Sequence, residues 1–318
     1  MRYNPLGDSG LMVSVVGVGC NAFGARIDED QTKAVVDAAI EQGITLFDTA
    51  DSYGDGASEE LLGRALGTRR ESVLVATKFG MGDHDAEHFG AHGSRRYVRR
   101  AVEASLRRLG TDYIDLYQLH RPDPITPIDE TLDAMSDLVT EGKVRYLGSS
   151  NLSAWQVADA DWVARTAGYH RFVSAQNEYS LYNRAAEDEL LPACERFGIG
   201  VLPYFPLAYG LLTGKYRRGD AAPAGSRLEA QAKRLENADW GRIEALQAFA
   251  DARDISLLTL AVGGLAAQPA VGSVICGVTR PEQVVANVEA GLWQPSEHDV
   301  ADLAELRHSS AFSYTTFA

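Results

Sequence analysis

The segment GITLFDTADSYG, residues 43–54, begins as a short apolar run and ends in a polar tail. The same change occurs in VLVATK, residues 73–78, and in YQLH, residues 117–120. Short apolar runs are typical of buried parallel strands, and the carboxyl ends of such strands converge on one face of a barrel. We therefore expect the polar residues of the three tails to meet in one site.

Apolar runs of this kind alternate with helix-like segments along the chain. The runs lie at residues 15–18, 44–47, 73–76, 114–117, 144–147, 172–175, 199–202 and 274–276. Segments with the apolar spacing of helices lie at residues 29–42, 58–66, 94–109, 128–141, 154–167, 185–197, 240–253 and 281–288. Strands that alternate with helices indicate a parallel sheet, and eight such units favour a closed (β/α)8 TIM barrel.

A doubly wound open sheet uses the same alternation but usually carries a nucleotide-binding fingerprint. Here GVG, residues 17–19, is followed by CNA, residues 20–22, so the third glycine of Gly-x-Gly-x-x-Gly is missing. The missing glycine favours the barrel. No linker interrupts the alternation, and we expect residues 1–318 to form a single barrel domain.

Two additions to the barrel are expected. Residues 2–4 and 11–13 flank a turn-forming GDSG segment, which predicts an N-terminal β-hairpin that covers the floor of the barrel. Residues 209–239 form a long irregular loop after the seventh strand, and loops of that length are usually functional or disordered. A loop that covers a cofactor would fit this pattern.

Composition limits the partners of the chain. It has 45% hydrophobic and 23% charged residues, as folded soluble proteins do, and no apolar run approaches the roughly 20 residues needed to cross a membrane. A net charge of −14 opposes nucleic-acid binding. The amino terminus lacks a secretory signal, and Cys20, Cys194 and Cys276 have no disulfide or zinc spacing, so we expect a cytoplasmic protein.

A basic cluster in the long loop stands out against this acidic background. Its members are Lys215, Arg217, Arg218, Arg227, Lys233 and Arg234. The cluster is either a solvated surface loop or a clamp for phosphate groups, and the sequence leaves both interpretations open.

The residue types in the polar tails suit carbonyl chemistry. Tyr53 can donate a proton to a developing alkoxide if its pKa, normally about 10, is lowered, and a nearby Lys78 ammonium would lower it. Asp48 can supply the charge that a desolvated lysine needs. His120 can donate a hydrogen bond to the carbonyl oxygen and orient it.

Each of these residues also has a plain structural interpretation. Asp48 could cap a helix, Lys78 could lie in a solvated loop, and Tyr53 could lie at the edge of the core. His120 could be a buried histidine with satisfied hydrogen bonds. The functional interpretation is favoured because four complementary groups fall at matching structural positions.

The segment GITLFDTADSYG, followed by SEELLG at residues 58–63, closely resembles the signature of the aldo-keto reductases, which are NAD(P)H-dependent (β/α)8 enzymes. The resemblance covers nearly the whole chain. It continues in ATK (76–78), LHRPD (119–123), GKVRYLGSSN (142–151), QNEY (176–179), GLLTGKY (210–216) and RPEQ (280–283).

The resemblance implies roles for individual residues. The catalytic residues would be Asp48, Tyr53, Lys78 and His120. The ligands of the nicotinamide carboxamide would be Ser150, Asn151 and Gln176, with Tyr204 stacked on the ring. Residues near the pyrophosphate would be Pro206, Leu207, Gly210, Leu211, Gly214 and Lys215, and residues at the adenosine end would be Gly277, Thr279, Arg280, Gln283 and Asn287.

The adenosine end departs from some members of that family. Gly277 stands where some members have a lysine for the 2′-phosphate, and Gln283 stands where they have an arginine. Arg280 could compensate for both. We therefore expect NADP(H) to be favoured, with NAD(H) possible.

The expected function is reduction of a small-molecule aldehyde or ketone, with the proton supplied by Tyr53. Two alternatives stay open: an NAD-dependent sugar or alcohol dehydrogenase, and a cofactor-sensing regulatory protein like the β subunits of potassium channels, which the family resembles. No nucleic acid or membrane partner is expected. The helix surfaces specify no oligomeric state.

Two further patterns have weaker interpretations. HDAEH, residues 84–88, matches a zinc motif, but the surrounding glycines argue against the rigid helix that the motif needs, and we expect no metal. Aromatic residues near strand ends could line a substrate pocket or pack in the core. They are Phe23, Phe79, Phe89 and Tyr209.

Overall fold

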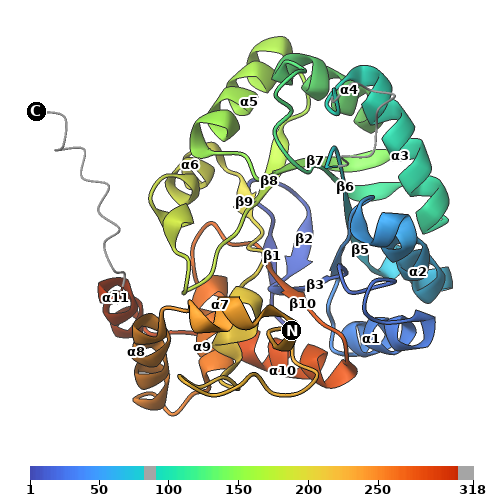
Figure 1. Ribbon diagram of the computed structural model, residues 1–318. Coiled ribbons are helices and arrows are strands. Elements are labelled where there is room, and N and C mark those ends of the chain that lie inside the picture. The colour runs from blue at the N-terminus through green and yellow to red at the C-terminus, as the bar shows by residue number, and fades with distance from the viewer. Residues whose placement is uncertain (82–90, 307–318) are drawn as a thin grey trace, which may run out of the picture.

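A computed structural model of the chain describes residues 1–81 and 91–306, in which parallel strands form one curved sheet with helices around it (Figure 1). The strands are β3 (Val16–Gly19), β4 (Leu46–Asp48), β5 (Leu74–Phe79), β6 (Ile114–Leu119), β7 (Val144–Ser150), β8 (Phe172–Gln176), β9 (Gly200–Val201) and β10 (Val274–Gly277). Their order in the sheet is β10-β3-β4-β5-β6-β7-β8-β9. The Ile275 amide donates to the Pro203 carbonyl at 3.0 Å, which joins the two outer strands. The predicted (β/α)8 barrel is confirmed.

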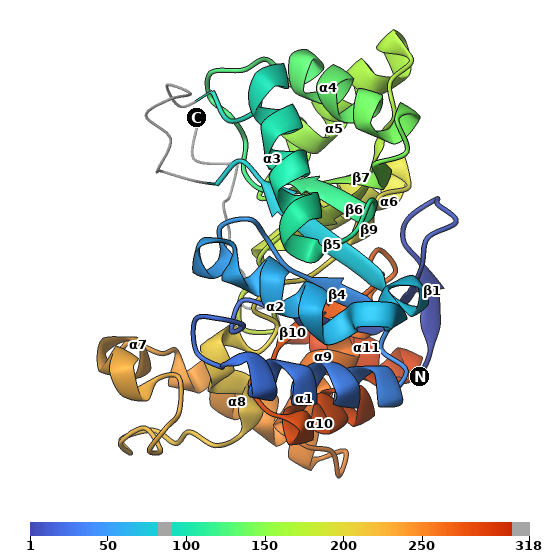
Figure 2. The same ribbon diagram turned by 90° about the vertical axis from the view of Figure 1, so that its right-hand side faces the viewer.

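The N-terminal hairpin forms as predicted, one residue later along each strand. β1 (Tyr3–Pro5) pairs antiparallel with β2 (Met12–Ser14). Leu6 and Val13 are fully buried in a cluster with Leu46 from the barrel interior. Burial of apolar side chains there closes the floor of the barrel. Figure 2 shows the hairpin at the opposite end of the barrel from α7.

Most of the predicted helices are present with small changes at their ends. They are α1 (Glu29–Glu41), α2 (Ala57–Leu66), α3 (Arg95–Leu109), α4 (Ile128–Thr140), α5 (Ala154–Ala167), α8 (Trp240–Asp251) and α10 (Pro281–Gly291). Asp28 and Ser153 cap α1 and α5 through reciprocal capping boxes, and Gly110 ends α3 at a φ of 63°. None of the helices in residues 1–81 and 91–306 combines the length and the apolar character needed to span a membrane.

The prediction of a single helix at residues 185–197 is wrong. The structure has a short 3-10 helix, η3 (Ala185–Glu187), and a separate α6 (Leu190–Phe197). A continuous helix would place Pro192 in its interior, where the ring clashes with the preceding turn and no N–H is available. Because α6 begins at Leu190, Pro192 falls in its first turn, where both problems disappear.

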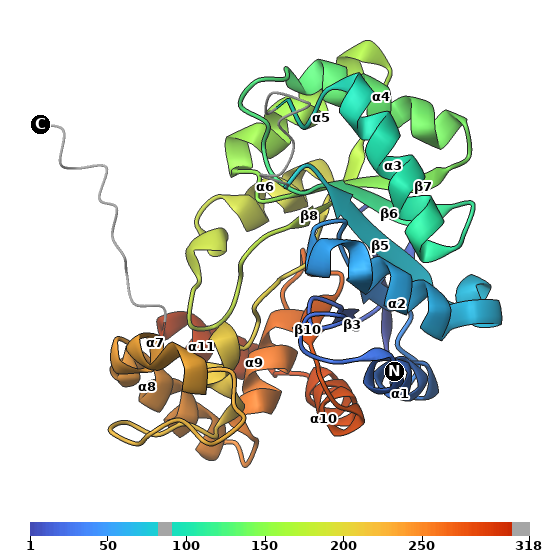
Figure 3. The same ribbon diagram turned by 45° about the vertical axis from the view of Figure 1, so that its right-hand side comes forward.

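A helix that the sequence did not reveal lies between the seventh and eighth barrel strands. It is α9 (Leu257–Ala266), with Ser256 as its N-cap, and it packs against α10 and β10. All of its residues except Thr259 are apolar or glycine, so no amphipathic spacing marks it. The predicted helix α8 packs on the outside of α9 instead of on the barrel (Figure 3). A last helix, α11 (Glu297–Glu305), was also missed.

The long loop after the seventh strand contains short structured pieces. It includes most of η4 (Ala208–Thr213), then η5 (Glu229–Gln231) and α7 (Ala232–Glu236). The remaining short helices of the fold are η1 (Tyr53–Gly56) and η2 (Gly67–Ser72). Leu228 is fully buried, so the loop is anchored on the barrel at that point.

Candidate functional site

A cavity of about 1120 Å³ lies at the carboxyl ends of the barrel strands. Gly19, Asp48, Ser150, Gln176 and Gly277 are each the last residue of a strand, and all of them line it. This convergence is the one expected from the parallel topology. The predicted site residues that line the cavity are Asp48, Tyr53, His120, Ser150, Asn151, Gln176, Tyr204, Pro206, Leu207, Gly210, Lys215, Gly277, Thr279, Arg280, Gln283 and Asn287.

Three predicted site residues lie outside the cavity wall. Lys78 is fully buried and reaches the site through Asp48. Leu211 is buried in the hydrophobic core, and Gly214 follows η4 with a φ of 78°. The two loop residues therefore shape the wall from behind.

Lys78 and Asp48 form a buried ion pair at the end of the cavity. The distance from Lys78 Nζ to Asp48 Oδ2 is 2.7 Å, and the ammonium also donates to the Thr49 carbonyl at 2.8 Å. Burial alone would lower the pKa of Lys78, but Asp48 and Tyr53 together raise it above the ordinary value. The lysine therefore keeps its positive charge in a place from which water is excluded.

Tyr53 opens η1 and lies over this lysine, with Lys78 Nζ 5.1 Å from the centre of the phenol ring. Burial raises the pKa of Tyr53, and this effect outweighs the lowering by the Lys78 ammonium. The expectation that Lys78 would bring the pKa below its ordinary value is therefore wrong in net direction. The lysine acts as expected, but desolvation is larger, so Tyr53 holds its proton at neutral pH.

His120 follows β6 and meets Tyr53 edge to face, with the ring centres 6.0 Å apart. Burial, and then the nearby charges of Lys78 and Arg121, lower the pKa of His120 to about 2. The imidazole is neutral at physiological pH and carries one N–H donor. Its Nδ1 is buried without a hydrogen-bond partner among the described residues.

Two glutamines hold the other oxygen of Asp48. Gln176 Nε2 donates to Asp48 Oδ1 at 2.8 Å, and Gln118 Nε2 donates to the same oxygen at 3.3 Å. The carboxylate is therefore fixed by an ammonium on one oxygen and two amides on the other. Gln118 was not predicted, although it lies two residues before His120 and so faces the same side of the strand.

Asn151 ties three strand ends together. Its amide donates to the His120 carbonyl at 2.9 Å and to Ser150 Oγ at 3.0 Å, while its Oδ1 accepts from the Tyr204 hydroxyl at 2.8 Å. The backbone at Asn151 has a φ of 61°, a conformation that asparagine tolerates better than most residues. Both ends of this amide are thus engaged within the protein, and the side chain fixes the position of Tyr204.

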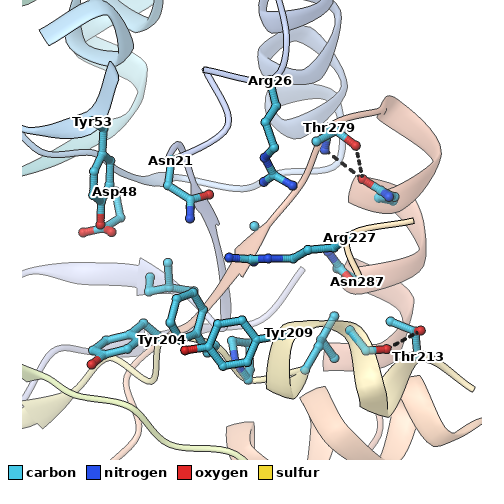
Figure 4. A pocket seen from close by; sticks show the side chains of 18 of the residues that line it. Asn21, Arg26, Asp48, Tyr53, Tyr204, Tyr209, Thr213, Arg227, Thr279 and Asn287 are labelled. Carbon is cyan, nitrogen blue, oxygen red and sulfur yellow. Dashed lines mark hydrogen bonds between the residues drawn. The ribbon is translucent and has the colours of Figure 1, made fainter. Parts of the chain in front are cut away.

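The cavity extends from this corner to the amino end of α10 (Figure 4). There, the Thr279 amide and hydroxyl lie 2.8 Å and 3.2 Å from Gln283 Oε1. Pro281 begins the helix, whose first free N–H groups suit an anion. Asn287 is buried beside them.

The cavity wall also includes residues that the sequence did not single out. They are Asn21, Arg26, Gln31, Met81, Arg121, Phe205 and Ser226, among others. Asn21 comes just after β3, and the strand-end argument that selected Asp48 would have found it. No pattern in the sequence marked Arg26.

The chemistry of the wall fits a nicotinamide dinucleotide. Asn21 Oδ1 is buried without a partner among the described residues, so an amide donor could bind there. Tyr204 offers a ring face for stacking, and Arg26, Lys215 and Arg227 offer positive charge for phosphate groups.

Some residues of the basic cluster in the long loop lie at the surface, and others line the cavity. Arg218 is bound to Glu244 at the surface at 2.8 Å and 2.7 Å, which is the solvated alternative. Arg227 and Lys215 line the cavity, which is the phosphate-binding alternative. Arg234 lies 3.6 Å from the ring centre of Tyr209.

The aromatic residues expected either in a substrate pocket or in the core are found in both places. Phe23 and Phe79 are fully buried in the core, whereas Tyr209 lines the cavity. Phe89 and the HDAEH motif at residues 84–88 lie outside the described residues. Within the described part of the chain, no three histidine, cysteine or acidic side chains gather as metal ligands would.

Comparisons with known proteins agree with this geometry. Residues 15–308 match the family model described as "Aldo/keto reductase family". The chain is 37% identical to a probable voltage-gated potassium channel subunit beta of Oryza sativa subsp. japonica, over 91% of each chain. It is 35% identical to probable aldo-keto reductase 1 of Glycine max, over 94% of this chain and 87% of that one. It is 33% identical to versiconal hemiacetal acetate reductase of Aspergillus parasiticus, over 92% and 94%.

Proposed function

The chain belongs to the aldo/keto reductase family of oxidoreductases, and from that premise we propose that it reduces an aldehyde or ketone to the alcohol with Tyr53 as the proton donor. The observation that carries the proposal is the joint geometry of four side chains. A protonated Tyr53 lies against the buried Lys78–Asp48 pair and beside a neutral His120. Tyr53, Lys78 and His120 are each in the protonation state that proton delivery to a carbonyl oxygen requires.

Tyr53, Lys78 and His120 have separate roles in the proposed reduction. When bound, the reduced nicotinamide supplies a hydride to the carbonyl carbon. Tyr53 donates its proton to the oxygen, and the Lys78 ammonium stabilises the phenolate that remains. His120 directs its single N–H toward the same oxygen and orients the substrate.

Asp48 acts through Lys78. Its carboxylate keeps the ammonium charged and in place, and the amides of Gln118 and Gln176 keep the carboxylate in place. We expect these three residues to be positioning residues, because none of them needs to touch the reacting atoms.

The steady-state rate of a Tyr53→Phe variant tests the assignment. We expect kcat to fall by about a hundredfold to ten-thousandfold, because the general acid is lost, while the affinity for NADPH stays the same. Tyr3→Phe is a matched control, since that hydroxyl lies at the surface on the Gly43 carbonyl. Turnover of Tyr53→Phe within a few fold of the wild type would exclude Tyr53 as the donor.

We also propose a preference for NADP(H) over NAD(H). Arg280 lies at the cavity end near Thr279, where the resemblance puts the adenosine. Intrinsic fluorescence titration with NADPH and NADH measures the preference directly. Equal dissociation constants for the two cofactors would refute it.

A regulatory role is a second candidate, and the observation behind it is the identity to probable potassium channel β subunits. A regulatory protein would bind the cofactor tightly and turn over slowly. A panel of carbonyl compounds with NADPH, and of alcohols with NADP⁺ and NAD⁺, separates the candidates. Fast reduction of a carbonyl supports the reductase, fast alcohol oxidation supports a dehydrogenase, and tight binding without turnover supports the regulatory role.

We further propose a cytoplasmic location. The three cysteines are free and buried, and free thiols suit a reducing compartment. Fractionation of the source cells, followed by immunoblotting, checks this proposal.

A further inference from the structure

Arg121 places a positive charge at the catalytic end of the cavity. It follows His120 directly after β6, and both residues line the cavity. After burial and Lys78, the charge of Arg121 is the next cause of the lowered pKa of His120. Burial raises the pKa of Tyr204, and the charge of Arg121 opposes this rise. Arg121 is therefore within electrostatic reach of two residues that surround the catalytic end.

The chain on both sides of Arg121 is held by hydrogen bonds. On one side, the His120 carbonyl accepts from the Asn151 amide at 2.9 Å. On the other side, the Asp123 carboxylate accepts from the Ile125 amide at 2.8 Å. The backbone that carries the guanidinium is thus fixed, while the side chain is exposed and able to reach a ligand.

Arg121 has no carboxylate within ion-pair distance among residues 1–81 and 91–306. Asp48, which lines the same end of the cavity, is already bound to Lys78 at 2.7 Å. Glu178 also acts on Tyr204, but it forms no ion pair with Arg121. The protein therefore leaves this positive charge available for an anion.

The location of Arg121 decides which molecule brings the anion. Figure 4 shows Tyr204 at the same end of the cavity as Asp48 and Tyr53, away from Thr279. The adenosine and phosphate groups of a dinucleotide are expected toward Thr279, so they are not the anion beside His120. In the proposed reaction, Tyr53 and His120 bind the carbonyl oxygen. The guanidinium is left for another part of the substrate.

We infer that Arg121 selects carbonyl substrates that carry a carboxylate or a phosphate group. This inference rests on the proposed carbonyl reduction and names the class of substrate for it. A guanidinium presents two parallel N–H donors, which match the oxygens of either anion. The anion fixes one end of the substrate while Tyr53 and His120 fix the carbonyl at the other. Because this contact is present in both the bound substrate and the transition state, its loss should appear mainly in KM.

Matched pairs of substrates test the selection. One pair is succinic semialdehyde and its methyl ester, and the other is glycolaldehyde phosphate and glycolaldehyde. We expect wild-type kcat/KM to favour the anion in at least one pair by about tenfold, because a hydrogen-bonded charge pair is worth about that much. The pair that shows the preference distinguishes carboxylate from phosphate.

Variants of Arg121 assign the preference to this side chain. Arg121→Gln should lower the ratio of anion to neutral substrate to near one, through KM. Arg121→Lys keeps the charge without the two parallel donors and should recover part of the ratio. Arg218→Gln is the matched control, since it removes the same charge at the surface, where Arg218 is bound to Glu244. Its ratio should equal that of the wild type.

Calorimetric titration gives a readout without turnover. Propionate and ethyl phosphate carry the two anions without a reducible carbonyl, and propionamide is the neutral control. The NADPH-saturated wild type should bind the anion of the preferred pair more tightly than propionamide. Arg121→Gln should lose this difference, whereas Arg218→Gln should keep it.

The outcomes separate this inference from the proposed function. A wild type that reduces carbonyl compounds of the panel without favouring the anion in either pair overturns the inference alone. A preference that is unchanged in Arg121→Gln also overturns it, because another group must then bind the anion. A wild type that reduces no carbonyl compound of the panel refutes the proposed reduction, and the inference falls with it.

Discussion

The two ends of the cavity are built in different ways. At the catalytic end, Lys78 and Asp48 are buried on strands, and their polar atoms are bound by other protein groups. At the other end, the wall includes a loop of short helical turns, and Arg26 and Arg227 face the cavity with no carboxylate partner among residues 1–81 and 91–306. The barrel therefore fixes the reacting groups in advance, whereas the loop leaves charges available for a ligand.

The backbone shows the same difference. Phe205, Ala208 and Tyr209 all have positive φ values, 52°, 46° and 61°, within five residues of the loop after β9. Each such conformation costs of order 1 kcal/mol or more for a residue with a side chain. In the strands that carry Asp48 and Lys78 no residue has a positive φ. Among the described residues, three of the six non-glycine residues with a positive φ therefore lie in this segment, while Asp55 and Asn151 are isolated cases near the catalytic residues.

The largest expected effect comes from breaking the catalytic end. In Lys78→Met, the Asp48 carboxylate stays buried without its cation, and the free energy of unfolding should fall by about 3–5 kcal/mol. Urea denaturation measures this loss. The double variant Asp48→Asn with Lys78→Met should recover much of the stability and none of the activity. A single variant as stable as the wild type would mean that the pair is not needed for the fold.

The next effect concerns His120 and pH. Its pKa is about 2 in the folded protein and about 6.5 when unfolded, so between these values the unfolded chain binds the extra proton. The free energy of unfolding should therefore decrease as the pH falls below 6.5, by about 1.4 kcal/mol per pH unit, because protonation of His120 favours the unfolded chain. Denaturation of His120→Gln at pH 7 and pH 5 should show a smaller pH dependence than the wild type. Equal slopes would contradict the neutral, buried imidazole.

The smallest expected effect concerns the backbone strain at Ala208 in the loop. Ala208→Gly should raise the free energy of unfolding by up to about 1 kcal/mol, because glycine adopts a positive φ without a steric cost. Ala164→Gly in α5 is the matched control, where the same substitution in a helix should destabilise the protein by about 0.5–1 kcal/mol. Thermal melts of both variants test the contrast. A destabilising Ala208→Gly would show that the loop is not strained there.

The sequence was sufficient for the parts of the molecule that obey local rules. Apolar runs with polar tails located Asp48 and His120, and the parallel topology brought them to one cavity. The largely apolar helix α9 had no periodicity to reveal it, because eight of its ten residues are buried. The split near Pro192 was readable in principle from the position of the proline.

Contacts between distant segments were beyond the sequence. The side-chain amide of Asn151 is hydrogen-bonded to the His120 carbonyl and the Tyr204 hydroxyl, and only the folded structure reveals these bonds. The net upward shift in the pKa of Tyr53 depends on how far burial outweighs Lys78. Arg26 and Arg227 face one cavity because the barrel brings their segments together, and no spacing of residues records that.

The central claim is that a protonated Tyr53, and not His120, delivers the proton. The pH dependence of kcat/KM for carbonyl reduction tests it most directly, with Tyr53→Phe as the reference. Because burial raises the pKa of Tyr53 above its ordinary value and that of His120 lies at about 2, we expect a flat profile from pH 5.5 to pH 9. A value of kcat/KM that falls as the pH rises, with a midpoint near pH 6.5 in both the wild type and Tyr53→Phe, would identify a histidine as the acid and contradict the account.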